Sequence, residues 1–304
     1  MATQKKGIIF ALFAYLIWGV FPIFWKQLSA VNSLEVLMSR VIWAFVFTTL
    51  FLIIIGQRKQ LWVDLKSLMQ QKGQLVRLFF ASLFISINWF VFIWAVANGQ
   101  ILQSSLGYYI NPLILVLFGV IFFKEKLESF TIVALLIATI GVLVLTISYG
   151  QVPWVALILA VTFAIYGVLK KKITLDATRG LAIETLFIVP FALIGYLYLV
   201  FKTEVAFINS GIEVSLYLML GGILTAIPLV LFAKGAQAVP LYLMGFAQFI
   251  APTISFLIGV FMYNEPFTKV ELTAFSCIWI AVLIFSSFKM LQTRKLMKKI
   301  NKKY

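Results

Sequence analysis

Two stretches of the sequence decide the fold: Ile110–Glu125 (INPLILVLFGVIFFKE) and Ile250–Glu265 (IAPTISFLIGVFMYNE), which lie 140 positions apart. Seven of their sixteen aligned positions are identical, and the matches include a proline, a glycine and a glutamate. Apolar matches arise easily in a hydrophobic chain, but these three residue types are not filler in a membrane helix. The match predicts that the protein is built from two copies of one structural unit.

The composition indicates an integral membrane protein. The chain has 304 residues, of which 63% are hydrophobic and 12% charged, and its mean hydropathy is +1.06. Soluble domains carry about 25% charged residues, so this chain has too little polar surface to be one. Since a span needs about 20 apolar residues, we expect ten transmembrane helices. They are expected near 7–26, 34–55, 76–97, 101–123, 129–149, 153–170, 180–201, 214–234, 239–262 and 267–288.

The positive charge predicts the orientation of these spans. The net charge of +15 comes from short basic clusters between apolar stretches, a pattern typical of cytoplasmic loops and not of a nucleic-acid-binding surface. With both termini in the cytoplasm, 21 of the 25 Lys and Arg residues lie on the cytoplasmic side. The loop 57–74 has apolar residues at helical spacing, which predicts an amphipathic helix at the membrane surface.

The number of helices in each unit predicts that the two units have opposite orientations in the membrane. Each unit contains five spans, an odd number, so the second unit must enter the membrane from the opposite side. We predict a first five-helix repeat over residues 1–150, a second, inverted repeat over 151–288, and a basic cytoplasmic tail over 289–304. Inverted repeats of this kind are typical of secondary transporters that work by alternating access.

Corresponding spans of the two units are interrupted by prolines and polar residues. A proline frees a backbone carbonyl, which membrane depth tolerates only beside protein or water, and paired interruptions point to a central site. The predicted helix-breaking residues are Pro22, Pro112, Pro228 and Pro252. The candidates to line a substrate cavity are Trp18, Asn88, Trp89, Tyr108, Tyr109, Asn111, Phe246 and Gln248. The other interpretation is that these residues only permit kinks and close helix packing.

Two charges lie inside spans, Arg40 and Glu184, which are 144 positions apart and therefore repeat mates. Intramembrane charges are usually functional, so both are candidates for ion coupling or for a buried charge. Alternatively, Arg40 extends to the outer surface, and Glu184 pairs with a nearby cation: Arg179, Lys170 or Lys234. The repeated glutamates Glu125 and Glu265 lie at helix ends, where we expect them to cap helices or form ion pairs.

The chain lacks the residues that several classes of protein need for their function. Histidine is absent and Cys277 is the only cysteine, so we expect neither a metal nor a disulfide. No nucleotide-binding loop of the G-x4-G-K-[ST] type and no catalytic constellation is present, so we expect no ATP-driven pump, cofactor or enzyme. The expected partners are a small-molecule substrate and the lipid bilayer; the sequence does not indicate an oligomeric state.

The chain resembles RarD-type permeases of the EamA branch of the drug/metabolite transporter superfamily, over essentially its full length. The resemblance rests most specifically on Ser105–Leu113 (SLGYYINPL), with Asn88–Trp89, Glu184–Leu186 and Gln248–Thr253 (QFIAPT). It implies a ten-helix, inverted-repeat transporter of the bacterial inner membrane with a central cavity. RarD-type sequences often have His-Arg where this chain has Ser39–Arg40, and Glu in place of Gln103. A proton route through that histidine or glutamate would be missing here.

The resulting expectation is a secondary transporter that exports small amphipathic metabolites or drug-like molecules by alternating access. Proton coupling through Glu184 is one form of this hypothesis. The alternative is an uncoupled facilitator or a lipid scramblase-like permease, which the scarcity of buried carboxylates favours.

Overall fold

A computed structural model describes residues 2–98, 101–148, 150, 152–202, 204–264 and 268–301. Within these ranges the regular structure is entirely helical. Ten segments are long and apolar enough to cross a membrane, α11 and α12 together forming one of them. The helices are α1 (Ala2–Lys26), α2 (Ser33–Ile54), α3 (Arg58–Gln70), α4 (Lys72–Ala97), α5 (Ile101–Phe123), α6 (Ser129–Ser148), α7 (Trp154–Lys172), α8 (Ala177–Lys202), α9 (Ala206–Asn209), α10 (Ile212–Ala238), α11 (Leu241–Gln248), α12 (Ile250–Tyr263) and α13 (Lys269–Asn301).

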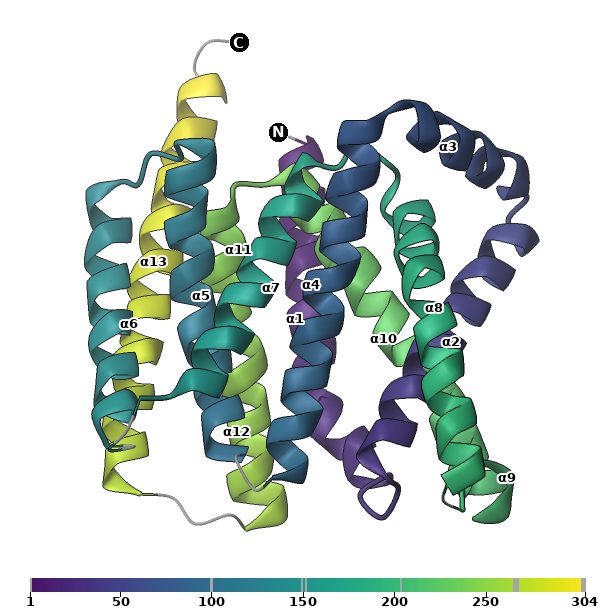
Figure 1. The fold of residues 1–304 in the computed structure, drawn as a ribbon. Helices are drawn as coiled ribbons and strands as arrows, with labels where there is room; N and C mark the ends of the chain where they lie inside the picture. Colours follow the sequence, from purple (N-terminus) through teal and green to yellow (C-terminus); the bar gives the residue numbers. More distant parts are fainter. Residues whose placement is uncertain are drawn as a thin grey trace.

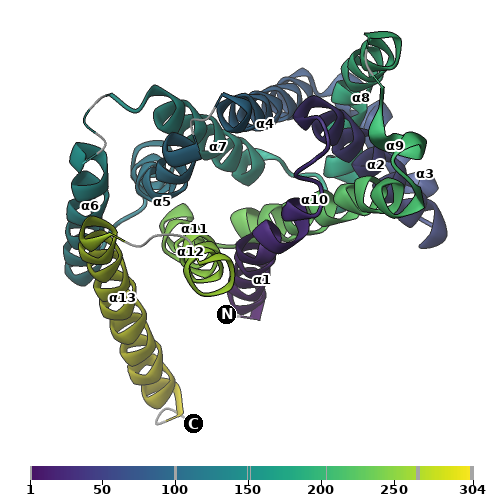
Figure 2. The same cartoon turned by 90° about the horizontal axis from the view of Figure 1, so that it is seen from below.

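The two halves of the chain run in opposite directions through the bundle. In Figure 1, α5 runs from the lower end to the upper end, whereas its repeat mate, α11 followed by α12, runs downward. Helix α1 begins and α13 ends at the upper end, which the charge distribution predicts to be cytoplasmic. Seen from below, α6 and α13 lie at one edge and α2 and α8 at the other, with α1, α4, α7 and α10 between them (Figure 2).

Equivalent contacts recur at the two ends. At the lower end, the Lys26 ammonium nitrogen lies 3.4 Å from the ring centre of Tyr263. At the upper end, the Lys171 ammonium nitrogen lies 5.3 Å from the ring centre of Phe123. Phe123 and Tyr263 are 140 positions apart, and the two lysines 145. One contact thus occurs twice with inverted direction, as the internal repeat predicts.

The ninth predicted span is two helices rather than one. Helix α11 ends at Gln248 and α12 begins at Ile250. Pro252 has no N–H to donate to the carbonyl of Gln248 four residues earlier, and its ring clashes with that carbonyl, so the helix breaks there. The other three prolines lie within continuous helices. The predicted surface helix is present as α3, and α13 continues to Asn301 through most of the predicted tail.

The outer surface of the bundle carries large apolar side chains. Ile54, Phe201 and Phe261 are 81%, 83% and 78% exposed, respectively. Such exposure is unfavourable in water but is expected for a surface in contact with lipid tails.

Candidate functional site

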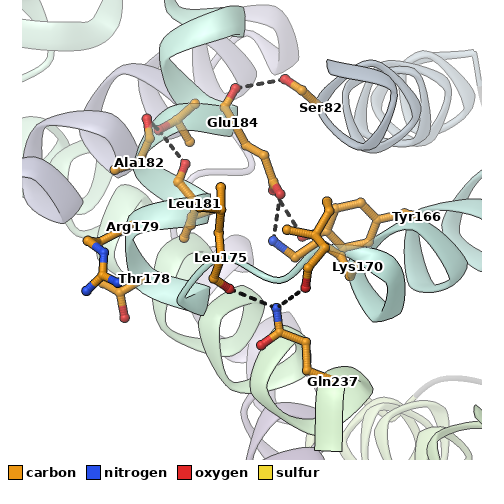
Figure 3. A network of polar contacts seen from close by, with 12 residues as sticks. Ser82, Tyr166, Lys170, Leu175, Thr178, Arg179, Leu181, Ala182, Glu184 and Gln237 are labelled. Carbon is orange, nitrogen blue, oxygen red and sulfur yellow. Dashed lines mark hydrogen bonds and ion pairs between the residues drawn. The ribbon is translucent and has the colours of Figure 1, made fainter. Parts of the chain in front are cut away.

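An ion pair buried in the protein closes the upper end of the interior. Lys170 of α7 places its ammonium nitrogen 2.6 Å from a carboxylate oxygen of Glu184 on α8, and both side chains are 1% exposed. The hydroxyl of Tyr166 donates to the other carboxylate oxygen at 3.4 Å, and Ser82 of α4 donates to the Glu184 backbone carbonyl at 2.7 Å. Figure 3 shows these contacts joining α4, α7 and α8.

Lys170 is not a loop residue, although the charge count placed it in the cytoplasm. It is one of the three cations that sequence reasoning offered as partners of Glu184. Arg179, another of the three, instead donates to Asp64 of α3 at 2.6 Å. Lys170 faces Glu184, whereas Lys172, two residues later, lies on another side of the same helix and is exposed.

A second set of polar contacts joins the two halves at the same end. The Glu125 carboxylate, at the end of α5, accepts from the backbone N–H groups of Leu241 (2.7 Å) and Tyr242 (3.0 Å) and so caps the start of α11. Lys171 lies 3.8 Å from this carboxylate. The side-chain amide of Gln237 donates to two carbonyls of the α7–α8 connection (Figure 3). The prediction of a cap is confirmed for Glu125; Glu265 lies outside the described residues.

An aromatic cluster fills the interior next to the ion pair. It consists of Tyr15, Trp18, Phe163, Tyr166 and Phe232. Trp18 of α1 lies 5.7 Å from Phe163 of α7 and 5.9 Å from Phe232 of α10, measured between ring centres. Tyr166 stacks on Phe232 at 5.8 Å. Tyr15, Tyr166 and Phe232 are fully buried. Together with the ion pair, these rings pack the upper half of the interior with buried side chains.

The lower half of the interior contains Arg40 of α2. Its Nε donates a 3.2 Å hydrogen bond to the Thr225 hydroxyl on α10. Its guanidinium carbon lies 5.1 Å from the ring of Trp25 on α1 and 4.8 Å from the ring of Trp89 on α4. Arg40 therefore does not extend to the outer surface but lies between helices of both halves.

A glycine makes this arrangement possible. At Gly222 of α10, a β-carbon would lie 2.4 Å from the backbone carbonyl carbon of Trp43 on α2, closer than real atoms approach. Only a residue without a side chain permits α2 and α10 to pack at this distance. Thr225 follows Gly222 by one turn, so the close approach brings its hydroxyl within reach of Arg40.

Tyr108 of α5 is partly exposed on an otherwise buried helix face. It shares that face with the buried Pro112, Leu115 and Gly119, which follow at spacings of 4, 7 and 11 residues. Nevertheless, 43% of Tyr108 is exposed, and its ring lies 5.9 Å from that of Phe92 on α4. On the neighbouring helices, Arg40 of α2 and Trp89 of α4 are in contact with each other.

Two pockets open near this group. One of about 540 Å³ lies at the lower end, between the α1–α2 connection and the end of α4, and is lined by residues that include Phe90 and Trp94. A smaller one of about 160 Å³ is also lined by Phe90, and by Trp89. Trp89 therefore borders a pocket and also faces the Arg40 guanidinium.

Asn88 and Asn111 bind the backbone of α7. The Asn88 amide nitrogen donates to the Leu159 carbonyl at 2.8 Å and to Thr162 at 3.0 Å. The Asn111 amide nitrogen donates to the Ala160 carbonyl at 2.7 Å, while its own carbonyl oxygen is buried without a partner among the described residues. Both amides hold helices of the two halves together.

The remaining cavity candidates lie on the other side of α5, toward α12 and α13. The Tyr109 hydroxyl donates to the Pro252 carbonyl at 3.3 Å, and its ring lies 5.2 Å from that of Phe275. Phe246 stacks on Phe285 at 3.9 Å. Gln248 is buried, and its side-chain carbonyl has no partner within the described ranges. The structure therefore brings Trp89 together with Arg40, whereas Tyr109 and Phe246 pack against phenylalanines of α13.

Three of the four predicted helix-breaking prolines lie four residues after a residue that was predicted to line the cavity. Because a proline cannot donate to the carbonyl four residues earlier, Pro22, Pro112 and Pro252 free the carbonyls of Trp18, Tyr108 and Gln248, respectively. Pro228 is buried in α10, where it frees the carbonyl of Leu224. The prolines thus remove the usual helical donor from the backbone carbonyls of three residues proposed to line the cavity.

Sequence reasoning missed three participants: Trp25, Thr225 and Tyr166. Trp25 follows Trp18 by seven residues, which places both on one face of α1 about 10 Å apart, and this spacing is a usable signal. Thr225 and Tyr166 carry no distinguishing signal within their apolar helices.

Comparison with known proteins places the chain in a family. Residues 5–147 match the model of the EamA-like transporter family. The uncharacterized transporter YojE of Bacillus subtilis is 47% identical over 94% of this chain and 95% of its own length. Protein RarD of Escherichia coli is 37% identical over 92% of this chain and 94% of its own.

A solved crystal structure supports the same fold. It superimposes with a TM-score of 0.68, covering 91% of this chain and 96% of its own, at 18% identity. Ten apolar helices and these bacterial relatives identify a multi-pass protein of the inner membrane, in contact with lipid and acting on a small molecule. The chain belongs to the EamA-like transporter family, in its group of RarD-type permeases.

Proposed function

We propose that the protein is a secondary transporter that exports small amphipathic metabolites or drug-like molecules by alternating access. The observation that carries the proposal is the unequal state of the two ends of an inverted-repeat interior. The upper end contains the buried Lys170–Glu184 pair and the buried aromatic cluster, whereas in the lower half Tyr108 is 43% exposed and a pocket of about 540 Å³ lies beside Phe90 and Trp94. Inverted repeats supply a second state in which the closed and open ends are exchanged.

The proposed substrate path runs between the halves, along Trp89 and Tyr108 toward Trp18. Aromatic rings offer flat apolar contact, and the freed carbonyls offer polar contact, which together suit an amphipathic molecule. With the upper end cytoplasmic, the observed state faces outward. The path proposed here moves the substrate without chemical change.

Proton coupling is the less supported part of the original hypothesis. A carboxylate that carries a proton across the membrane must lose its counter-charge during the cycle, and Glu184 is held by Lys170 at 2.6 Å. Opening of the upper end would separate this pair, so coupling through Glu184 stays a possibility of the mechanism. The firmly paired state favours the alternative, an uncoupled facilitator or scramblase-like permease.

An untargeted metabolite profile of cells and medium tests the proposal. Three strains would be compared at equal membrane levels: wild type, Tyr108→Ala on the proposed path, and Phe261→Ala on the lipid-facing surface. We expect a compound that is depleted inside and enriched outside in the wild type and the Phe261→Ala strain, but not with Tyr108→Ala. Accumulation inside the cells would show import instead of export. Equal profiles in all strains, or a chemically altered compound, would contradict the proposal.

A further inference from the structure

The structure assigns to Arg40 the role of binding the negatively charged group of the substrate, so that the transported molecule is an organic anion with a flat apolar body. This inference rests on the proposed transport function and names its substrate class. It follows from the contacts, the charge balance and the surroundings of this one side chain.

The guanidinium of Arg40 retains most of its hydrogen-bonding capacity. A guanidinium has five N–H donors, and within the described part of the chain only Nε is used, on the Thr225 hydroxyl. The terminal nitrogens form the fork that binds a carboxylate through two parallel hydrogen bonds. An anion can therefore be added without breaking an existing contact of Arg40.

The chain does not neutralise the charge of Arg40. No carboxylate in the described ranges lies within ion-pair distance of it. Glu35, on the same helix as Arg40, and Glu184, its repeat mate, both have other partners. Glu35 accepts from the backbone N–H groups of Ala206 and Phe207, both at 2.8 Å. Glu184, the repeat mate of Arg40, has Lys170. A buried charge normally has a partner, and here an external anion would supply it.

The surroundings of Arg40 suit an aromatic or otherwise flat acid. Trp25 and Trp89 both approach the guanidinium. Trp89 also lines the pocket of about 160 Å³, which is otherwise lined mostly by apolar side chains. The cationic group thus lies next to aromatic rings of α1 and α4, one of which borders a pocket that a flat apolar body can enter.

Binding to the purified full-length protein in detergent tests this assignment. The probes are phenylacetate and 3-phenylpropionate, with phenylacetamide and phenethylamine as a neutral and a cationic counterpart of similar shape. Binding is followed by intrinsic tryptophan fluorescence and by thermal stabilisation. We expect the acids to bind wild type and the amide and amine to bind at least about tenfold more weakly, as for loss of a charge-assisted hydrogen bond.

Three variants decide which residue is responsible. Arg40→Met should weaken binding of the acids at least about tenfold, and Arg40→Lys should retain an intermediate affinity, because a single point charge replaces the fork. Lys26→Met is the matched control, since it removes another cation at the lower end, where Lys26 lies over Tyr263. Each variant is compared only if its elution profile and unliganded melting temperature match those of the wild type, and Arg40→Gln replaces Arg40→Met if that variant misfolds.

Equal binding of acid and amide, undiminished acid binding by both Arg40→Met and Arg40→Gln, or no binding of either acid at millimolar concentrations would overturn the assignment. Its failure is distinguishable from that of the transport proposal. Export of a neutral compound that is insensitive to Arg40→Met would leave transport standing and remove the anion site. Binding of acids through Arg40 without transport in liposomes would support the anion site and contradict the transport proposal.

Discussion

Neutralising Lys170 or Glu184 alone should destabilise the protein far more than neutralising both together. Their charged atoms lie 2.6 Å apart and both side chains are 1% exposed. At an effective dielectric constant of about 20, two unit charges at this distance attract each other by about 6 kcal/mol. Part of that attraction offsets the desolvation of both ions, so loss of one partner is expected to cost about 3–5 kcal/mol. This corresponds to a factor of about 150 to 5,000 in the unfolding equilibrium.

Lys170→Met and Glu184→Gln should therefore each lower the free energy of unfolding by about 3–5 kcal/mol. The double variant keeps similar shapes without a charge, and it should lie within about 1.5 kcal/mol of wild type. The measurement is SDS-induced unfolding of purified protein in mixed micelles, followed by tryptophan fluorescence. Lys172→Met, two residues away and exposed, is the control and should change the free energy by no more than about 0.5 kcal/mol.

Two results would refute this reasoning. Single variants as stable as wild type would mean that the pair is not desolvated or not formed. A double variant whose loss equals the sum of the single losses would mean that the two side chains act independently, which a 2.6 Å contact does not allow.

Three further predictions concern the transport cycle in liposomes. In a Cys277→Ser background, Gly119→Cys with Leu241→Cys should form a disulfide at the upper end, because a β-carbon at Gly119 would lie 3.2 Å from that of Leu241. The atom nearest to that β-carbon is a Glu125 carboxylate oxygen at 2.5 Å, at the end of a flexible side chain that can move aside. Oxidation should stop transport and reduction restore it; transport by the oxidised protein would show that the upper end need not open. The doubly neutralised Lys170–Glu184 variant should lose any dependence on a pH gradient if the pair carries the proton; retained dependence excludes it. Efflux of an organic acid should respond to a valinomycin-imposed potential by about 2.3 kcal/mol per 100 mV for one charge, and a potential-independent rate would contradict anion transport.

The sequence was sufficient to predict the helices and the inverted repeat, because both depend on patterns along the chain. Span length follows from hydropathy, and the 140-residue match gives the repeat directly. Even the division of the ninth span has a local cause in Pro252, although the pattern did not distinguish it from Pro112, which lies within a continuous helix.

The site was less predictable because α5 is packed on more than one side. Tyr108 and Tyr109 are adjacent, of the same type and about 100° apart around the helix. Tyr108 is 43% exposed, whereas Tyr109 packs against Phe275 on α13. Only the packing of distant helices determines which side faces the substrate path. Arg40 had two open interpretations for the same reason, since its contacts with Trp25, Trp89 and Thr225 come from three other helices.

The contrast between Arg40 and Glu184 connects the proposed substrate with the proposed direction. They occupy equivalent positions of the two repeats, yet among the described residues Glu184 has a counter-charge and Arg40 has none. If an organic anion supplies the other, the loaded interior is neutral at both positions, and the high cost of an isolated intramembrane charge is avoided during passage. A monovalent anion leaving a cell with a negative interior also gains about 2.3 kcal/mol per 100 mV. Export of such an anion then needs no coupling proton, which agrees with the buried carboxylates in the described residues: Glu184 is paired with Lys170, and Glu35 and Glu125 accept from backbone N–H groups.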